Sequence, residues 1–202
     1  RIDGREKVTG QAMYSGDLVM PGMLHMKILF AMRPHARILS IDTSAAEKVP
    51  GVVAVFTDKD VPVNEYGLQW NDQPVLCGPN SSLPGCDIVR FVGDQVALVV
   101  AETEKIAEHA RSLIKVEYQD LPLVVDAEEA MKEGATLLHG HRQDTNICVW
   151  DKIRKGDVEA GFAQSDVIVE DTYRVPVQEH VFLQPEAGIA YMEDGILTCL
   201  LY

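Results

Sequence analysis

The chain has 202 residues, of which 47% are apolar, a composition that supports one large or two small packed domains and argues against a disordered segment. Its 18 basic and 31 acidic residues give a formal net charge of −13, which argues against nucleic acid as a partner and against docking on an anionic membrane surface. Apolar runs reach at most six residues, whereas a helix that crosses a bilayer needs about 20.

The negative charge is concentrated in the second half of the chain. Residues 1–101 carry a net charge of −2, and residues 102–202 carry −11. The chain starts with Arg1 and stops within the largely apolar stretch 196–202, so we expect both ends to be cut from a longer polypeptide. The N-terminus lacks the apolar stretch of a secretory signal, and we expect a cytoplasmic protein.

The first half of the chain alternates short strands with turns. Its first 20 residues are polar and contain three glycines, which is typical of an extended arm. Short apolar and β-branched runs then predict strands. The expected elements are an arm over 1–20, strands over 24–31, 37–41 and 52–56, a short helix over 45–48, and a turn or helical cap over 57–60.

A long connection follows over residues 62–87, with four prolines and three glycines. Connections of this length in a compact domain are usually functional or mobile. The other interpretation is a surface excursion without chemistry, and the residues themselves leave both open.

The next segment contains the clearest helix. Thr103 can cap it, and five apolar residues between 106 and 114 fall on one face at the helical period. Asp126 and Glu129 resemble a capping box for a second, shorter helix. The expected elements are strands over 89–92 and 95–101, either paired or forming one bent strand broken at Gly93-Asp94, helices over 103–114 and 127–132, and a strand over 115–118.

Residues 134–157 are irregular and polar, which indicates a boundary or linker. Beyond it the sequence predicts a short helix through Ala163, a long alternating strand over 166–175, and a hairpin of 188–192 and 196–201 around Glu193-Asp194-Gly195. The whole is a mixed α+β pattern that lacks the βαβ rhythm of a doubly wound parallel sheet.

Common catalytic and metal-binding motifs are missing from the sequence. The spacings of phosphate-binding loops are absent, and the four cysteines form no CxxC pair, so we expect reduced, mostly packed thiols. His139 and His141 form the closest histidine pair and permit either a metal site or an exposed polar loop. Arg33 and Arg37 form a basic patch that either binds an anion or pairs with nearby acids.

Residues 177–186 carry two carboxylates, two amides and an imidazole. Glu179 and His180 are adjacent, and neighbouring residues of a strand face opposite ways, so they cannot easily act on one atom. We therefore expect a polar, buried turn that organises a neighbouring site and is not itself a catalytic centre.

Three segments in this order carry a resemblance to a known family. They are DGREKVTG (3–10) with YSGD (14–17), RPHARI (33–38) with PGV (50–52), and VGDQVA (92–97) with VEY (116–118). Together they resemble the α/β hammerhead domain of the xanthine dehydrogenase and aldehyde oxidase family. GDV (156–158), DVIVE (166–170) and QEH (178–180) resemble the entry to that family's molybdopterin-binding region, although Gln184 stands where many members have a glutamate.

The resemblance implies an α/β hammerhead domain over 1–133, a linker over 134–155, and the truncated first part of a molybdopterin-binding domain over 156–202. It implies a molybdenum-cofactor hydroxylase that oxidises a purine-like N-heterocycle or an aldehyde with oxygen from water. The family's cofactor-contacting glutamine, its glycine-rich segment and its catalytic glutamate are absent from the 202 residues. We therefore assign no catalytic, cofactor-binding or metal-binding residue and expect an inactive, structural fragment.

The same resemblance implies partners. In the family, electrons pass to iron–sulfur clusters and often to FAD, on other domains or subunits, and the basic patch at 33–37 and the loop 62–87 are candidate docking surfaces. Two alternatives remain open: a carbon-monoxide-dehydrogenase-like member of the family, and a free-standing hammerhead interaction module without catalysis.

Overall fold

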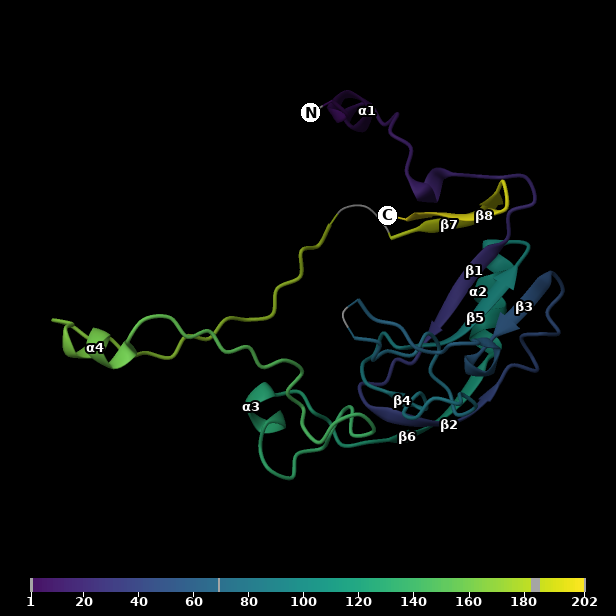
Figure 1. The fold of residues 1–202 in the computed structure, drawn as a ribbon. Coiled ribbons are helices and arrows are strands. Elements are labelled where there is room, and N and C mark those ends of the chain that lie inside the picture. Colours follow the sequence, from purple (N-terminus) through teal and green to yellow (C-terminus); the bar gives the residue numbers. More distant parts are fainter. Residues whose placement is uncertain (1, 69, 183–185, 202) are drawn as a thin grey trace. The chain divides into compact units, whose positions relative to one another are not determined.

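The computed structural model describes residues 2–68, 70–182 and 186–201, and the chain separates into two compact units (Figure 1). Unit 2 is Met23–Asp151, and unit 1 combines Arg1–Gly22 with Lys152–Tyr202. Sheets and a few helices occur together, which confirms the mixed α+β class. Within the described ranges, no helix is long and apolar enough to cross a membrane.

The first sheet of unit 2 is antiparallel and has β5 (Gln95–Ala101) at its centre, between β1 (His25–Phe30) and β3 (Val52–Phe56). Helix α2 (Glu104–Leu113) packs on one face, and the Thr103 hydroxyl caps it by accepting the Ile106 N–H at 3.3 Å. These elements confirm the predicted strands and helix. Small side chains let the helix lie close to the sheet. The buried core between them is Ala97, Val99, Ala101, Ala107, Ala110 and Ile114.

The second sheet of unit 2 places β2 (Ala36–Asp42) between β4 (Ile88–Val89) and β6 (Lys115–Asp120). The expected pairing of 89–92 with 95–101 is therefore wrong, because β4 and β5 belong to different sheets. The Asp94 carboxylate accepts the backbone N–H groups of Arg90 and Phe91, and this turn carries the chain from one sheet to the other.

The connection over 62–87 forms part of the core of unit 2 and is not merely a surface excursion. Asn64 is buried, and its side-chain amide donates to Leu76 O at 2.7 Å and accepts from Leu76 N at 3.0 Å. Leu76 and Cys77 are each 1% exposed, and Cys77 N donates to Gln95 O on β5 at 2.7 Å. The prolines and glycines thus shape a loop that packs against the central strand.

Two of the shorter predicted elements in unit 2 are formed. The 3₁₀ turn η2 (Asp58–Asp60) follows Thr57, and α3 (Ala127–Ala130) begins where the Asp126 carboxylate accepts from Glu129 N at 2.9 Å. The helix predicted over 45–48 is wrong. That segment is a turn. The side chains of Asp42 and Thr43 form local hydrogen bonds with Ser44 and Glu47, respectively. Pro50 prevents the chain from continuing as a helix.

Unit 1 is built on a hairpin of β7 (Gly188–Glu193) and β8 (Ile196–Leu201), as predicted. Asp194 and Gly195 both have positive φ, of 51° and 79°, as a type I′ turn requires. Ser15 donates from Oγ to Ala187 O at 2.9 Å. This bond attaches the 3₁₀ turn η1 (Ser15–Asp17) to the start of the hairpin.

Two further segments of unit 1 are helical. Helix α4 (Val158–Ala163) is confirmed and is capped by the Asp157 carboxylate, which accepts from Ala160 N at 3.0 Å. The arm predicted over 1–20 contains a short helix, α1 (Gly4–Val8), that its glycines did not indicate.

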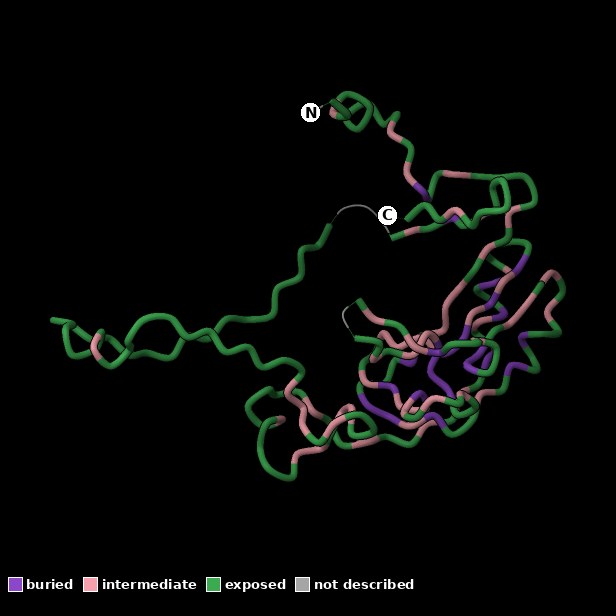
Figure 2. Tube along the Cα trace, in the orientation of Figure 1, coloured by how far each residue is buried: buried purple, intermediate pink, exposed green. Residues whose placement is uncertain are grey.

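The long strand predicted over 166–175 is not formed. These residues are exposed and have no strand or helix assignment (Figure 2). Alternation alone does not make a strand, because the backbone groups need a neighbouring strand to bond with. Among the described residues none supplies that neighbour.

Candidate functional site

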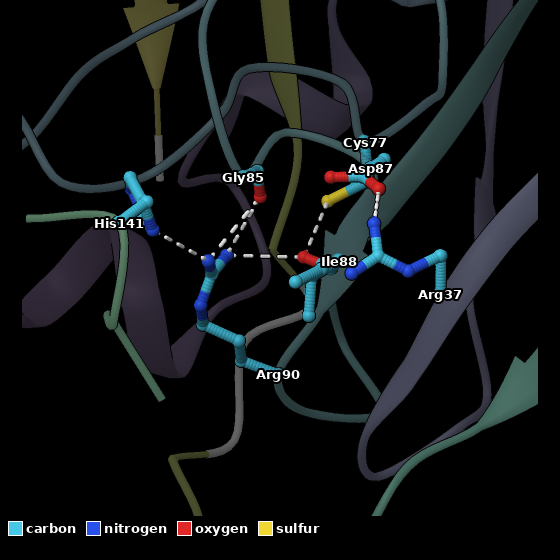
Figure 3. Close-up of polar contacts among 7 residues, drawn as sticks. All are labelled: Arg37, Cys77, Gly85, Asp87, Ile88, Arg90 and His141. Atoms are coloured by element: carbon cyan, nitrogen blue, oxygen red, sulfur yellow. Dashed lines mark hydrogen bonds and ion pairs between the residues drawn. The ribbon is translucent and has the colours of Figure 1, made fainter. Parts of the chain in front are cut away.

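Arg90 is the centre of a polar cluster in unit 2 (Figure 3). Its Nε donates to Leu138 O at 2.7 Å, both terminal nitrogens lie 3.2 Å from Gly85 O, and Nη1 also donates to Ile88 O at 3.0 Å. Nη2 lies 3.5 Å from His141 Nδ1. We call these five residues the Arg90 clasp. It joins the end of the 62–87 loop, strand β4 and the segment that follows α3.

The charges of Arg90 and of the neighbouring Asp94 are partly buried. Burial lowers the pKa of the Arg90 guanidinium, which nonetheless stays charged because arginine titrates far above neutral pH. Burial also raises the pKa of the Asp94 carboxyl, although the N–H groups of Arg90 and Phe91 act against that rise. A positive charge shared among backbone carbonyls positions chain segments, and it offers no group that attacks a substrate.

Of the two predicted histidines, His141 belongs to the clasp, and His139 lies two residues before it in the chain. Their ring centroids are 6.0 Å apart, and burial, followed by the charge of Arg90, lowers the pKa of both. His139 is half-buried and its Nδ1 has no hydrogen-bond partner. No group of three or more His, Cys, Asp or Glu could hold a metal ion in the part of the chain that the structure describes. His141 itself is exposed, and the described residues do not complete a metal site around the pair.

Further contacts hold the segment after α3 in place. Arg142 forms an ion pair with Glu65 of the 62–87 loop. The Asn146 side chain accepts from Leu138 N at 2.9 Å and donates to Thr136 O at 2.9 Å and Ala130 O at 3.0 Å. The predicted linker is thus irregular but fixed over its first part.

Acidification is expected to destabilise unit 2 through His139 and His141. Their pKa values are lower in the folded chain, so the unfolded chain binds more protons, up to about two, and stability falls as the pH drops from 7 through the ordinary histidine pKa. Asp94 acts in the opposite sense, because its raised pKa lets the folded chain take up a proton before the unfolded chain does as the pH falls.

Urea unfolding at pH 7, 6 and 5 tests this expectation. The double variant His139→Gln/His141→Gln should lose most of the decline between pH 7 and 5. His109→Gln, at an exposed position on α2, is the control and should keep it. An unchanged decline in the double variant would contradict the assignment.

The basic patch is already neutralised by local acids, as its second interpretation predicted. Arg33 lies 3.6 Å from Asp120 and 5.7 Å from the centre of the Tyr118 ring, and Arg37 forms an ion pair with Asp87. The two guanidinium groups therefore do not converge on one anion. A docking role for this surface stays a prediction.

The segment 177–186 does not form the expected buried turn in its described part. Residues 177–182 are exposed, and the contact given for the Glu179 carboxylate is with the backbone N–H of His180, at 2.9 Å. Residues 183–185, which include Gln184, lie outside the described residues. Glu179 and His180 are not held toward a common atom.

Two of the four cysteines are packed and two are not. All four are free; Cys77 and Cys86 are buried, whereas Cys148 and Cys199 are exposed. Burial raises the pKa of the Cys77 thiol, which makes it a poor nucleophile. The expectation of mostly packed thiols is met only in the first half of the chain.

The described residues do not build a cradle that fits a molybdenum cofactor. The stretch expected nearest to such a site, 177–182, is exposed, and the polar cluster of unit 2 uses its donors on its own backbone. We therefore derive no chemical step on this chain. That no catalytic, cofactor-binding or metal-binding residue belongs to it stays a prediction.

Comparison with known proteins identifies the family. Residues 9–122 match the family model of the aldehyde oxidase and xanthine dehydrogenase α/β hammerhead domain, and residues 138–201 match that of the molybdopterin cofactor-binding domain. The first match covers more than half of the chain. The chain therefore belongs to the xanthine dehydrogenase and aldehyde oxidase family of molybdenum-containing oxidoreductases.

Its relatives are considerably longer. The chain is 47% identical over 195 residues to a probable xanthine dehydrogenase subunit of Bacillus subtilis, a match that covers 96% of this chain and 25% of the relative. It is 36% identical to the nicotinate dehydrogenase large molybdopterin subunit of Eubacterium barkeri, over 100% of this chain and 45% of the relative. The aldehyde oxidoreductase of Desulfovibrio gigas is 32% identical with a TM-score of 0.79, over 98% of this chain and 22% of that one.

Proposed function

We propose that this chain is the hammerhead-bearing part of the large, molybdenum-binding subunit of a hydroxylase. The 47% identity to a probable xanthine dehydrogenase subunit, across 96% of the chain, carries the proposal. The intact enzyme oxidises a purine-like or other N-heterocycle, or an aldehyde, with oxygen taken from water. The names of the nicotinate and aldehyde relatives support this range of substrates.

Within that enzyme the chain acts as a scaffold. The molybdenum cofactor supplies the redox chemistry when bound, and it is held by other parts of the subunit. Iron–sulfur clusters and FAD lie on partner domains or subunits and take up the electrons. The contribution of this chain is a packed two-sheet unit whose clasp fixes the first residues of the stretch that matches the molybdopterin cofactor-binding domain. The boundaries at 133/134 and 155/156 belong to this proposal.

A substrate panel on the intact enzyme tests the proposal. Hypoxanthine, nicotinate, benzaldehyde and carbon monoxide are supplied in ¹⁸O-labelled water with an artificial electron acceptor. We expect oxidation of an N-heterocycle or of the aldehyde, with ¹⁸O in the product. Oxidation of carbon monoxide alone would instead establish the carbon-monoxide-dehydrogenase alternative, and failure with every substrate would contradict the proposal.

A further inference from the structure

The first sheet of unit 2, formed by β1, β5 and β3, has two faces that differ in burial. Along β5, residues Val99 and Ala101 are fully buried, whereas Leu98 and Val100 are only half-buried. Because side chains alternate across a strand, the two sets face opposite ways. The buried set faces α2, since Val99 and Ala101 share a cluster with Ala107 and Ala110 of that helix.

Strand register shows which residues share the other face. Met26 and Ala54 lie opposite Val100, while Ile28 and Phe56 lie opposite Leu98. Partners that lie directly opposite in an antiparallel pair project on the same side of the sheet. We call the resulting surface the open face; its six residues are Met26, Ile28, Ala54, Phe56, Leu98 and Val100.

The open face is apolar and accessible. None of its six residues is charged, and Met26 and Phe56 remain 56% and 41% exposed. The same side of β5 is covered at its other end. Val96 is fully buried in a cluster with Cys77 of the 62–87 loop and Ile38 of β2. The open face therefore continues the apolar core around Val96. Beyond Val96 this side of β5 is no longer covered.

We propose that the open face packs against the remainder of the same large subunit, the polypeptide that longer relatives carry beyond the aligned segment. This inference rests on the proposed function. The Bacillus subtilis relative, 47% identical, is only 25% covered, so such subunits contain about three times more polypeptide than the aligned segment. An uncharged, core-like surface is typical of permanent contacts and not of transient ones.

Two other occupants fit the observations less well. An anionic membrane surface is disfavoured by the net charge of −13. A second copy of the chain would lose translational and rotational freedom on association, a cost that a covalently attached segment avoids. The remainder of the same subunit is covalently attached and needs no such association.

Methionine oxidation tests the inference. The purified large subunit is treated with hydrogen peroxide in native and urea-unfolded states, and Met26 is followed by mass spectrometry. We expect Met26 to oxidise about tenfold more slowly in the native subunit. As a second readout, Met26→Lys should lower the yield of folded large subunit severalfold, whereas Met131→Lys should not, because Met131 lies outside the open face and is 60% exposed.

Each outcome decides the inference. Equal rates of Met26 oxidation in native and unfolded subunit would overturn it. Protection that needs added partner subunits, or that disappears on dilution, would also overturn it, because another polypeptide or a second copy would then be the occupant. Protection in a subunit that binds no molybdenum would leave the inference standing and refute the proposed function.

Discussion

Replacement of Arg90 by methionine is expected to lower the free energy of unfolding of unit 2 by about 3 kcal/mol. Hydrogen bonds to charged groups contribute about 1.5–3 kcal/mol each, and water partly replaces those that the variant loses. The variant leaves three carbonyl oxygens, of Gly85, Ile88 and Leu138, without their guanidinium donor. The segment after α3 then loses its contacts with Arg90 and keeps the ion pair of Arg142 with Glu65. Urea unfolding measures the stability change.

Hydrogen exchange gives a local readout of the same variant. The amides of Arg142 and Gln143 both donate to His139 O, at 2.8 and 3.1 Å, and should exchange faster once the clasp is removed. Arg33→Met is the matched control, since Arg33 makes an exposed ion pair at 3.6 Å that is worth less than about 1 kcal/mol. Identical unfolding curves for the two variants would show that the clasp has no structural role.

Replacement of Gly78 by alanine is expected to destabilise unit 2 by about 2–3 kcal/mol, the range for forcing an extra carbon into a packed site. A Cβ there would lie 2.8 Å from Asp58 Cβ, and closer still to its Cγ and Oδ1. Neither the backbone at Gly78 nor the side chain of Asp58 can easily move away. Gly78 N donates to Cys86 O at 2.9 Å, and Asp58 is 1% exposed and accepts the Asn80 N–H. Thermal or urea unfolding measures the loss.

A double-variant cycle separates the clash from a general effect of alanine. In an Asp58→Gly background the contacting side-chain atoms are gone, so Gly78→Ala should cost less than in the parent chain. Gly161→Ala is the control, because a Cβ at Gly161 meets nothing within 4 Å. Equal costs of Gly78→Ala with and without the Asp58 side chain would contradict the steric explanation.

Much of the fold was predictable because local signals were strong. The apolar stripe and the Thr103 cap define α2, and Asp194-Gly195 defines the hairpin turn. The pairing of β4 with β2 and of β5 with β1 was not predictable, because each pair joins strands that are distant in sequence. The strand over 166–175 was wrong for a related reason, since alternation indicates a strand but does not supply a partner.

The polar cluster was largely missed. The sequence drew attention to His139 and His141 as a pair, whereas the residue that organises their surroundings is Arg90. One signal was available: Arg90 is the only Lys or Arg between Lys59 and Lys105, and it stands among apolar residues. An isolated cation in an apolar stretch needs buried acceptors, although sequence alone does not say that they are the carbonyls of Gly85 and Leu138.

We propose that this chain is a scaffold within a molybdenum hydroxylase and holds no molybdenum itself. Metal analysis compares the purified 202-residue chain with the large subunit to which we assign it. We predict stoichiometric molybdenum in the large subunit and none above background in the 202-residue chain. Stoichiometric molybdenum on the 202-residue chain, or none on the large subunit, would contradict this proposal.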